Sequence, residues 1–277
     1  MPEITAQTEV LEDGEPIFWL SAPWEGTPTL YLHGVPTASF DWKPFLERTG
    51  GLAPDLPGSR RTTKRGPRAF TTAAHADFVE SFLDERGLER VNLVVHDWGA
   101  VGLEWAQRRP ERVERLVIID AVPFLPGYRW HRTARVWRTP GLGELSMGLT
   151  FKWTFRLLSR ESNATPGPLP EALLDQTMDG FDLGTQRAIL QLYRTSPPAR
   201  LEQAGSRLGE ITCPALVVWG DRDPYIVPHF ADLYAGALGG PAEVLHLEDA
   251  GHWPWLDRPD LVETVAGFLA GEPGATR

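Results

Sequence analysis

The ten residues Leu93–Gly102 read LVVHDWGAVG, and this stretch is the strongest indication of the fold in the chain. A short apolar run enters a tight His-Asp-Trp-Gly corner and leaves it through small residues that can open a helix. A strand, a sharp turn and a helix in this order form the elbow on which acyl-transfer enzymes present a catalytic serine. Here Asp97 occupies the apex. The chemistry must therefore be one that uses a carboxylate in place of a hydroxyl.

Composition restricts the class of protein. The chain has 277 residues, a length that fits about two domains or one large domain with an insertion. Hydrophobic residues make up 42% of the chain, which is enough for a sizeable core. Its net charge of −10 disfavours nucleic acid as a partner, because phosphate binding needs a basic face. The single cysteine, Cys213, permits no intrachain disulfide. No apolar run is long enough for a membrane helix or a signal peptide, so we expect a cytoplasmic protein with no membrane partner.

Strand-like and helix-like segments alternate along most of the chain. The pattern predicts strands at 29–32, 51–55, 91–95, 113–119, 214–219 and 242–247, and helices at 71–86, 99–109, 227–238 and 257–270. Thr71 or Thr72 can cap the first of these helices. This alternation is typical of an α/β protein with a mostly parallel sheet covered by helices on both faces.

The alternation stops between Pro123 and about Arg207, where no convincing strand is found. Trp130, Ala134 and Trp137 have the spacing of one apolar helical stripe. We expect residues 1–122 and 208–277 to form the core domain. Residues 123–207 are expected to form a helical cap, inserted after the sixth strand (113–119) and lying over the strand ends, where ligands bind in such sheets.

Three more fragments follow predicted strands: HGVP at 33–36, GDRD at 220–223 and GHW at 251–253. With Asp97 as a nucleophile, an aspartate of GDRD as an acid and the histidine of GHW, these three groups occur in that order along the chain. The fragments HGVP, VHDWGA, GDRD and AGHW resemble the α/β-hydrolase superfamily, and within it the aspartate-nucleophile branch of epoxide hydrolases and haloalkane dehalogenases. The resemblance covers the whole chain, and the segment 123–207 takes the place of that family's cap.

This resemblance implies an α/β-hydrolase fold and a hydrolase with no cofactor and no metal. Its substrates would be a small organic molecule and water. It also implies a triad of Asp97, Asp223 and His252, with an oxyanion hole made by the backbone N–H groups of Val35 and Trp98.

An aspartate at the elbow makes chemical sense only for some substrates. A carboxylate that attacks an ester or amide carbonyl gives an anhydride, whereas one that attacks a saturated carbon gives an ordinary ester that water can still hydrolyse. Asp97 would form this ester, and His252 would activate the water of the second step. The acid would orient His252 and stabilise its charge.

Each role has a competing interpretation. Asp97 can instead be a helix N-cap, and His252 a surface histidine in a loop. Asp221 and Asp120 are rivals of Asp223 as the acid. His33 is interpreted as structural, with its ring bonded to backbone near the turn.

The leaving group separates the two branches. A departing halide needs two hydrogen-bond donors. The resemblance assigns one of these roles to Trp98. The second is commonly the asparagine of HGNP, but Val35 occupies that position and has no side-chain donor. The cap tryptophans Trp137 and Trp153 are alternatives.

An epoxide instead needs cap tyrosines that protonate its oxygen. Tyr193 resembles one of them, and Tyr128 or His131 are candidates for the other. Tyr193 can also be an aromatic side chain that fills the cap.

We favour an epoxide hydrolase, with a haloalkane dehalogenase as the alternative and a non-catalytic binding protein as a more remote one. The series Arg129, Arg132, Arg135 and Arg138 is interpreted as a solvated cap surface. The oligomeric state stays open.

Overall fold

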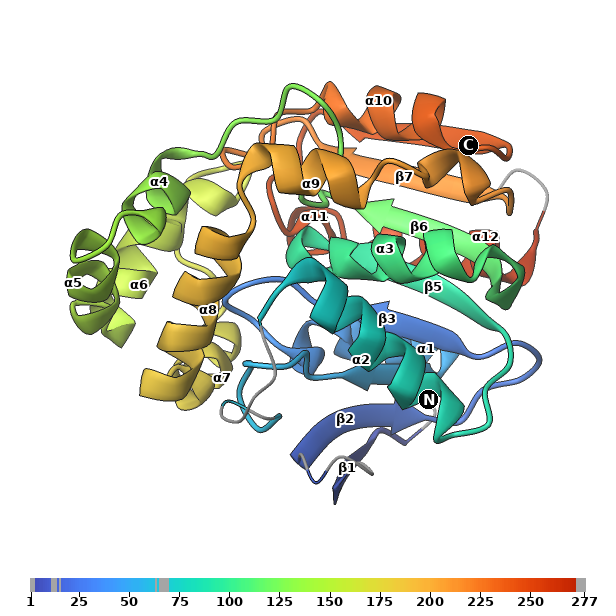
Figure 1. Ribbon diagram of the computed structural model, residues 1–277, viewed down its shortest axis with the longest axis horizontal. Helices are drawn as coiled ribbons and strands as arrows, with labels where there is room; N and C mark the ends of the chain where they lie inside the picture. Colours follow the sequence, from blue (N-terminus) through green and yellow to red (C-terminus); the bar gives the residue numbers. More distant parts are fainter. Residues whose placement is uncertain (1–2, 11–13, 15, 63, 65–69, 273–277) are drawn as a thin grey trace.

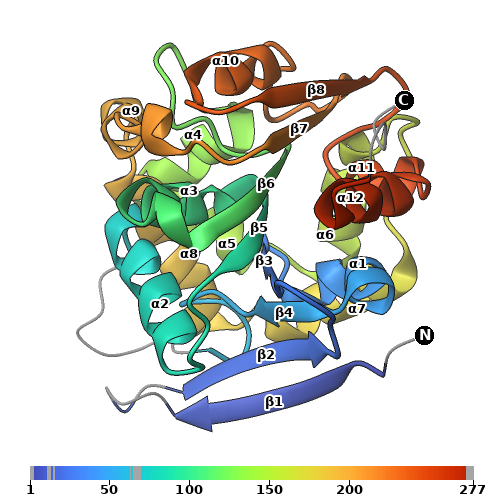
Figure 2. The same cartoon turned by 90° about the vertical axis from the view of Figure 1, so that its right-hand side faces the viewer.

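The centre of the computed structural model, which describes residues 3–10, 14, 16–62, 64 and 70–272, is an eight-stranded twisted sheet (Figures 1 and 2). Its strands are β1 (Thr5–Val10), β2 (Pro16–Ala22), β3 (Thr29–Leu32), β4 (Gly51–Pro54), β5 (Val91–His96), β6 (Val113–Ile119), β7 (Ala215–Gly220) and β8 (Ala242–Leu247). They lie in the order β1-β2-β4-β3-β5-β6-β7-β8. Only the pairings β1 with β2 and β2 with β4 are antiparallel.

Helices cover both faces of this sheet (Figure 2). One face carries α2 (Thr72–Asp84), α3 (Val101–Arg108) and α10 (Phe230–Ala237), and the other carries α1 (Lys43–Thr49), α11 (Pro254–Asp257) and α12 (Leu261–Ala270). Strand residues alternate between the two cores: Leu93 and Val95 face the first, and Val94 faces the second. A sheet buried on both faces explains the apolar runs in the sequence, and the predicted α/β architecture with a mostly parallel sheet is present.

A group of helices connects β6 to β7. It consists of α4 (Arg132–Arg138), α5 (Leu142–Gly148), α6 (Lys152–Leu158), α7 (Glu171–Gly180), α8 (Leu183–Thr195) and α9 (Pro198–Ala204). Figure 1 shows α4 to α8 gathered at one end of the sheet, whereas α9 returns to contact α2. The exact division into core and cap stays a prediction. None of the described helices is long and apolar enough to cross a membrane.

Several element bounds differ from those predicted. The last predicted helix (257–270) begins four residues later, as α12 at Leu261, just after Pro259, and the short helix α11 that precedes it was not predicted. The α4 helix begins at Arg132 because the side chain of His131 caps it, so Trp130 lies before the helix and not on its stripe. Strands β1 and β2 were not predicted: β1 is an edge strand with every residue exposed, so it carries no hydrophobic pattern.

Candidate active site

The elbow after β5 places Asp97 at the end of the sheet that faces the cap. Its backbone has φ +49°, a left-handed conformation that is uncommon for a residue other than glycine. Gly99 makes this tight turn possible, since a Cβ there would lie 2.0 Å from the carbonyl oxygen of Leu32. The strand-turn-helix context predicted from the sequence is therefore present, and it holds the Asp97 side chain in one direction.

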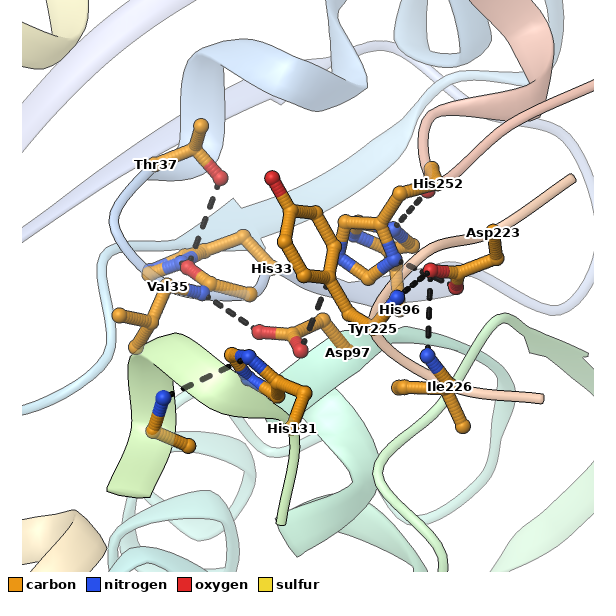
Figure 3. Close-up of polar contacts among 12 residues, drawn as sticks. His33, Val35, Thr37, His96, Asp97, His131, Asp223, Tyr225, Ile226 and His252 are labelled. Atoms are coloured by element: carbon orange, nitrogen blue, oxygen red, sulfur yellow. Dashed lines mark hydrogen bonds and ion pairs between the residues drawn. The ribbon is translucent and has the colours of Figure 1, made fainter. Parts of the chain in front are cut away.

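Two backbone N–H groups point at the Asp97 carboxylate. Val35 N donates to Oδ1 at 2.8 Å (Figure 3). Burial raises the pKa of Asp97, while nearby His252 and the N–H groups of Val35 and Trp98 act in the opposite direction by stabilising the anion. Both predicted oxyanion-hole donors are thus directed at the same carboxylate. Gly34 allows this approach, because a Cβ on it would lie 2.4 Å from the Asp97 Cβ.

His252 lies between the two aspartates predicted to flank it (Figure 3). Its Nδ1 is 2.7 Å from Asp223 Oδ2, and its Nε2 is 3.8 Å from Asp97 Oδ2. Burial alone would lower the pKa of His252, but the negative charges of Asp223, Asp97 and Asp41 raise it above its ordinary value. Nδ1 therefore carries the proton bonded to Asp223, and Nε2 is the atom free to accept one near Asp97.

The two rival acids, Asp221 and Asp120, have other hydrogen-bond partners than His252. Asp221 is half-buried and pairs with His246 at 2.8 Å, away from His252. Asp120 is fully buried at the end of β6, and its Oδ1 accepts a hydrogen bond from Gly220 N at 3.0 Å. Asp223 alone contacts His252 Nδ1, and its own Oδ1 is held by the backbone N–H groups of Tyr225 (2.7 Å) and Ile226 (3.1 Å).

Two histidines near the predicted triad have structural hydrogen bonds. His33 Nε2 accepts from Leu56 N at 2.9 Å, and its Nδ1 donates to the carbonyl of Gly34 at 2.7 Å, as its structural interpretation requires. His96 was not singled out from the sequence. Its Nε2 lies 2.8 Å from the backbone oxygen of His252, and burial lowers its pKa well below the ordinary value, so it is a neutral donor that fixes the His252 backbone.

A cavity of about 490 Å³ lies between the elbow and the cap. Its lining includes Asp97, His252, Tyr193, Trp137 and His131. Apolar side chains make up much of the remaining wall, and an apolar cavity with a few polar groups suits a small organic molecule. Tyr225, which was not predicted, also lines it, with its ring 5.0 Å from that of His252. Its position two residues after Asp223, the predicted acid, is the feature of the sequence that could have indicated a residue of the site.

Tyr193 is the centre of an aromatic cluster. Its ring lies 5.0 Å from Trp98, 4.9 Å from Trp130 and 5.1 Å from Trp137. Burial and the charge of Asp97 raise the pKa of Tyr193 well above its usual range, although the indole of Trp98 lowers it in part. The phenol is therefore un-ionised at neutral pH and holds a proton that it can donate.

The other side chains of the cap that the sequence suggested for the site differ in whether they line the cavity. Tyr128 packs against Trp130 and Phe230 outside the residues that line the cavity, and its buried hydroxyl has no hydrogen-bond partner among the described residues. Trp153 is 68% exposed and also lies outside the lining. The structure thus brings Tyr193, Trp137 and His131 to the cavity and leaves Tyr128 and Trp153 away from it.

The arginine series is not uniformly solvated. Arg132 makes an exposed ion pair with Glu161 at 3.3 Å. Arg138 is half-buried and donates to the backbone carbonyls of Tyr193 and Ser196, the latter at 2.9 Å. No group of His, Cys, Asp and Glu side chains suited to a metal ion occurs in the part of the chain that the structure describes.

Comparison with known proteins places these features in a family. Residues 30–265 match the model of the alpha/beta hydrolase family. A haloalkane dehalogenase of Mycolicibacterium paratuberculosis is 32% identical, with 89% of this chain and 84% of the relative covered. One from Bradyrhizobium diazoefficiens is 27% identical, with 87% and 86% covered.

Solved structures agree with the fold. A crystal structure of a haloalkane dehalogenase from Bradyrhizobium elkani superposes with a TM-score of 0.82 and 26% identity, over 97% of this chain and 98% of that one. An epoxide hydrolase solved without ligand shares the fold with a TM-score of 0.83 at 20% identity, over 97% and 99% of the chains. With its elbow, its family match and these relatives, the chain belongs to the alpha/beta hydrolase family, among relatives that include haloalkane dehalogenases, and it is a hydrolase enzyme.

Proposed function

We propose that this hydrolase opens an electrophilic alkyl carbon through a covalent ester of Asp97, and that epoxides are its preferred substrates. The observation that carries the proposal is that the two oxygens of the Asp97 carboxylate have different neighbours. Asp97 Oδ1 accepts the N–H of Val35, while Oδ2 is the oxygen nearest His252 Nε2. One oxygen is thus held in the oxyanion hole, and the other is available as the nucleophile.

In the first step, Asp97 Oδ2 attacks a ring carbon of the epoxide and the carbon–oxygen bond of the ring breaks. The electron pair goes to the epoxide oxygen, which takes a proton from the Tyr193 hydroxyl. The phenol suits this role because its raised pKa keeps it protonated and its ring is fixed among three tryptophans.

In the second step, His252 Nε2 takes a proton from water, and the resulting hydroxide attacks Cγ of the ester. Negative charge then develops on Oδ1, where the N–H groups of Val35 and Trp98 stabilise it. Collapse of this intermediate releases the diol and restores the Asp97 carboxylate. The proton on His252 returns to the Tyr193 phenolate through solvent, so one epoxide and one water give one diol.

His131 is the second donor of this site in our proposal. Its Nδ1 accepts the N–H of Ala134 at 3.4 Å as the cap of α4, so the proton of the neutral ring must be on Nε2 (Figure 3). Burial lowers the pKa of His131 to about 4, which keeps the ring neutral at physiological pH. The remaining N–H can therefore hydrogen-bond the epoxide oxygen from the cavity wall.

Haloalkane dehalogenation is the second candidate, and two observations favour it. The relatives described above are named haloalkane dehalogenases. Trp98 occupies the position after Asp97 that the resemblance assigns to a halide donor, although its buried indole lies outside the cavity lining and hydrogen-bonds the Tyr193 hydroxyl. Against it, Val35 offers no side-chain donor, and the ring of Tyr193 contacts both Trp98 and Trp137, the two indoles that a halide would need.

Paired release assays test the proposal. Purified enzyme is incubated with terminal epoxides and with bromoalkanes of matched chain length, and diol and bromide are quantified. We expect diol formation that disappears in Asp97→Ala. Bromide release without diol formation would assign the enzyme to the second candidate. Product formation that persists in Asp97→Ala would remove the covalent mechanism altogether.

A further inference from the structure

Asp120 is an unusual residue that the proposed mechanism does not use. It follows β6 directly, and its backbone has φ +39°, a left-handed conformation that is uncommon for a residue other than glycine. The residue is 0% exposed. A buried carboxyl is costly to maintain, so its surroundings should explain it.

The two oxygens of Asp120 differ. Oδ1 accepts the N–H of Gly220 at 3.0 Å. Oδ2 is buried, and within the described part of the chain no N–H or O–H group donates to it. A buried carboxylate with one oxygen left unsolvated and unbonded is unfavourable, and such groups become neutral by taking up a proton. The proton would then reside on Oδ2.

The proposed triad acid, Asp223, lies one backbone link away from Asp120. Gly220 joins the two aspartates, since its N–H donates to Asp120 Oδ1 and its carbonyl accepts the N–H of Asp223 at 3.0 Å. Burial is the main cause that raises the pKa of Asp120 well above its ordinary value, and the charge of Asp223 and a hydrogen bond between the two carboxyls raise it further. Asp223 meanwhile accepts from Tyr225 N, Ile226 N and His252 Nδ1.

We infer that Asp120 is a protonated carboxylic acid that donates its Oδ2 proton to the Asp223 carboxylate. The acid of the triad is then a carboxyl pair that shares one proton and one negative charge. Asp120 is a positioning residue: it gives Asp223 a fourth hydrogen bond, which fixes the plane of the carboxylate that orients His252. The inference deepens the proposed function, because it rests on Asp223 serving His252.

Infrared spectroscopy tests the protonation without any substrate, so its outcome is independent of the proposed reaction. The spectrum of the wild type minus that of Asp120→Asn should contain the carbonyl stretch of an un-ionised carboxylic acid at about pH 9. Asp41→Asn is the matched control: burial raises the pKa of Asp41 to about 7, so this second buried acid is ionised under those conditions. Absence of an acid band that is specific to Asp120 would overturn the inference.

Kinetics test the positioning role. Asp120→Asn keeps an N–H donor toward Asp223 and should slow hydrolysis of the Asp97 ester only a few-fold. Asp120→Leu removes the donor and should slow that step at least about tenfold. It should also move the midpoint of the pH profile upward, because Asp223 without this donor stabilises protonated His252 more strongly.

Two kinetic outcomes contradict the inference. If Asp120→Asn is as damaging as Asp223→Asn, Asp120 is itself the ionised acid. If Asp120→Leu behaves like Asp120→Asn in rate and pH midpoint, the proton on Asp120 has no positioning role. Thermal unfolding of each variant distinguishes these effects from a general loss of the fold.

Discussion

Asp97 and His252 act in different steps of the proposed reaction, so one substitution can separate them. His252→Gln should leave ester formation intact but block its hydrolysis, because only the water-activation step needs the base. Intact-mass spectrometry should then show a protein heavier by one substrate, with the added mass on the peptide that contains Asp97. Wild-type enzyme in heavy-oxygen water should instead label the same carboxylate over repeated turnovers. An unmodified His252→Gln protein after incubation with a good substrate would contradict the covalent mechanism.

The Tyr193 hydroxyl distinguishes the two leaving groups. For an epoxide, Tyr193→Phe should slow formation of the Asp97 ester by roughly ten- to a thousandfold, the range for loss of one acid or oxyanion donor. Tyr128→Phe is the matched control, because that hydroxyl lies outside the cavity lining. Single-turnover kinetics measure the step directly. Equal effects of the two substitutions would remove Tyr193 from the mechanism, and tolerance of Tyr193→Phe with loss of bromide release in Trp98→Phe would favour the dehalogenase.

The pH dependence of the second step follows from the charges around His252. Only the neutral imidazole can accept a proton from water, and neighbouring carboxylates raise its pKa above the ordinary value of about 6.5. Ester hydrolysis should therefore be slow in acid and increase as pH rises through a midpoint above that value. His131 should contribute no transition there, since its pKa is about 4. A rate constant for ester hydrolysis that does not change between about pH 5 and 9 would contradict this assignment of the base.

At the scale of elements, Arg138 connects α4 to the end of α8. Its guanidinium donates to the carbonyls of Tyr193 and Ser196, whereas Arg135 on the same helix is exposed. Arg138→Gln should lower the free energy of unfolding by about 1–3 kcal/mol, because partly buried carbonyls lose a charged donor. Arg135→Gln is the matched control and should change it by less than about 0.5 kcal/mol. Urea unfolding measures both, and equal values would mean that the contact adds no stability.

The sheet was predictable where its strands are buried on both faces. Strands β5, β6 and β7 contain the apolar runs LVV (93–95), LVII (116–119) and ALVVW (215–219), because helices cover them on each side. Strand β1 was not predictable, since it lies at an edge and pairs with β2 mainly through backbone groups that any sequence provides. Helix starts were predictable where a side chain caps the first turn, as Thr71 does for α2.

The proposed triad was predictable to the extent that turns bring it together. Asp97 and Asp223 stand in short turns after buried strands, so their positions follow from local sequence. The choice between Tyr128 and His131 was not predictable, because it depends on how the segment before α4 folds back over the elbow. Likewise, spacing alone gave Arg138 the same status as Arg135, although only packing against α8 makes it a backbone donor.

For the whole molecule, the net charge of −10 affects which substrates approach the cavity. An anionic substrate should show a lower kcat/KM than a neutral one of equal size, because like charges reduce its local concentration. Salt should narrow the difference, since the screening length falls from about 10 Å at 0.1 M to about 3 Å at 1 M. A carboxylated epoxide and its methyl ester, compared at low and high ionic strength, measure this. A difference that is unaffected by salt would place its cause inside the cavity and not in the overall charge.

Position 35 contributes to the site through its backbone N–H, a group present in every amino acid except proline. Selection for the proposed oxyanion hole would therefore place little constraint on which side chain stands there. That side chain also lines the cavity, where a valine and an asparagine would present very different surfaces to a leaving group. A lineage can thus change its substrate at this codon while the hydrolytic step continues to work, which gives divergence within this family an evolutionary path that avoids inactive intermediates.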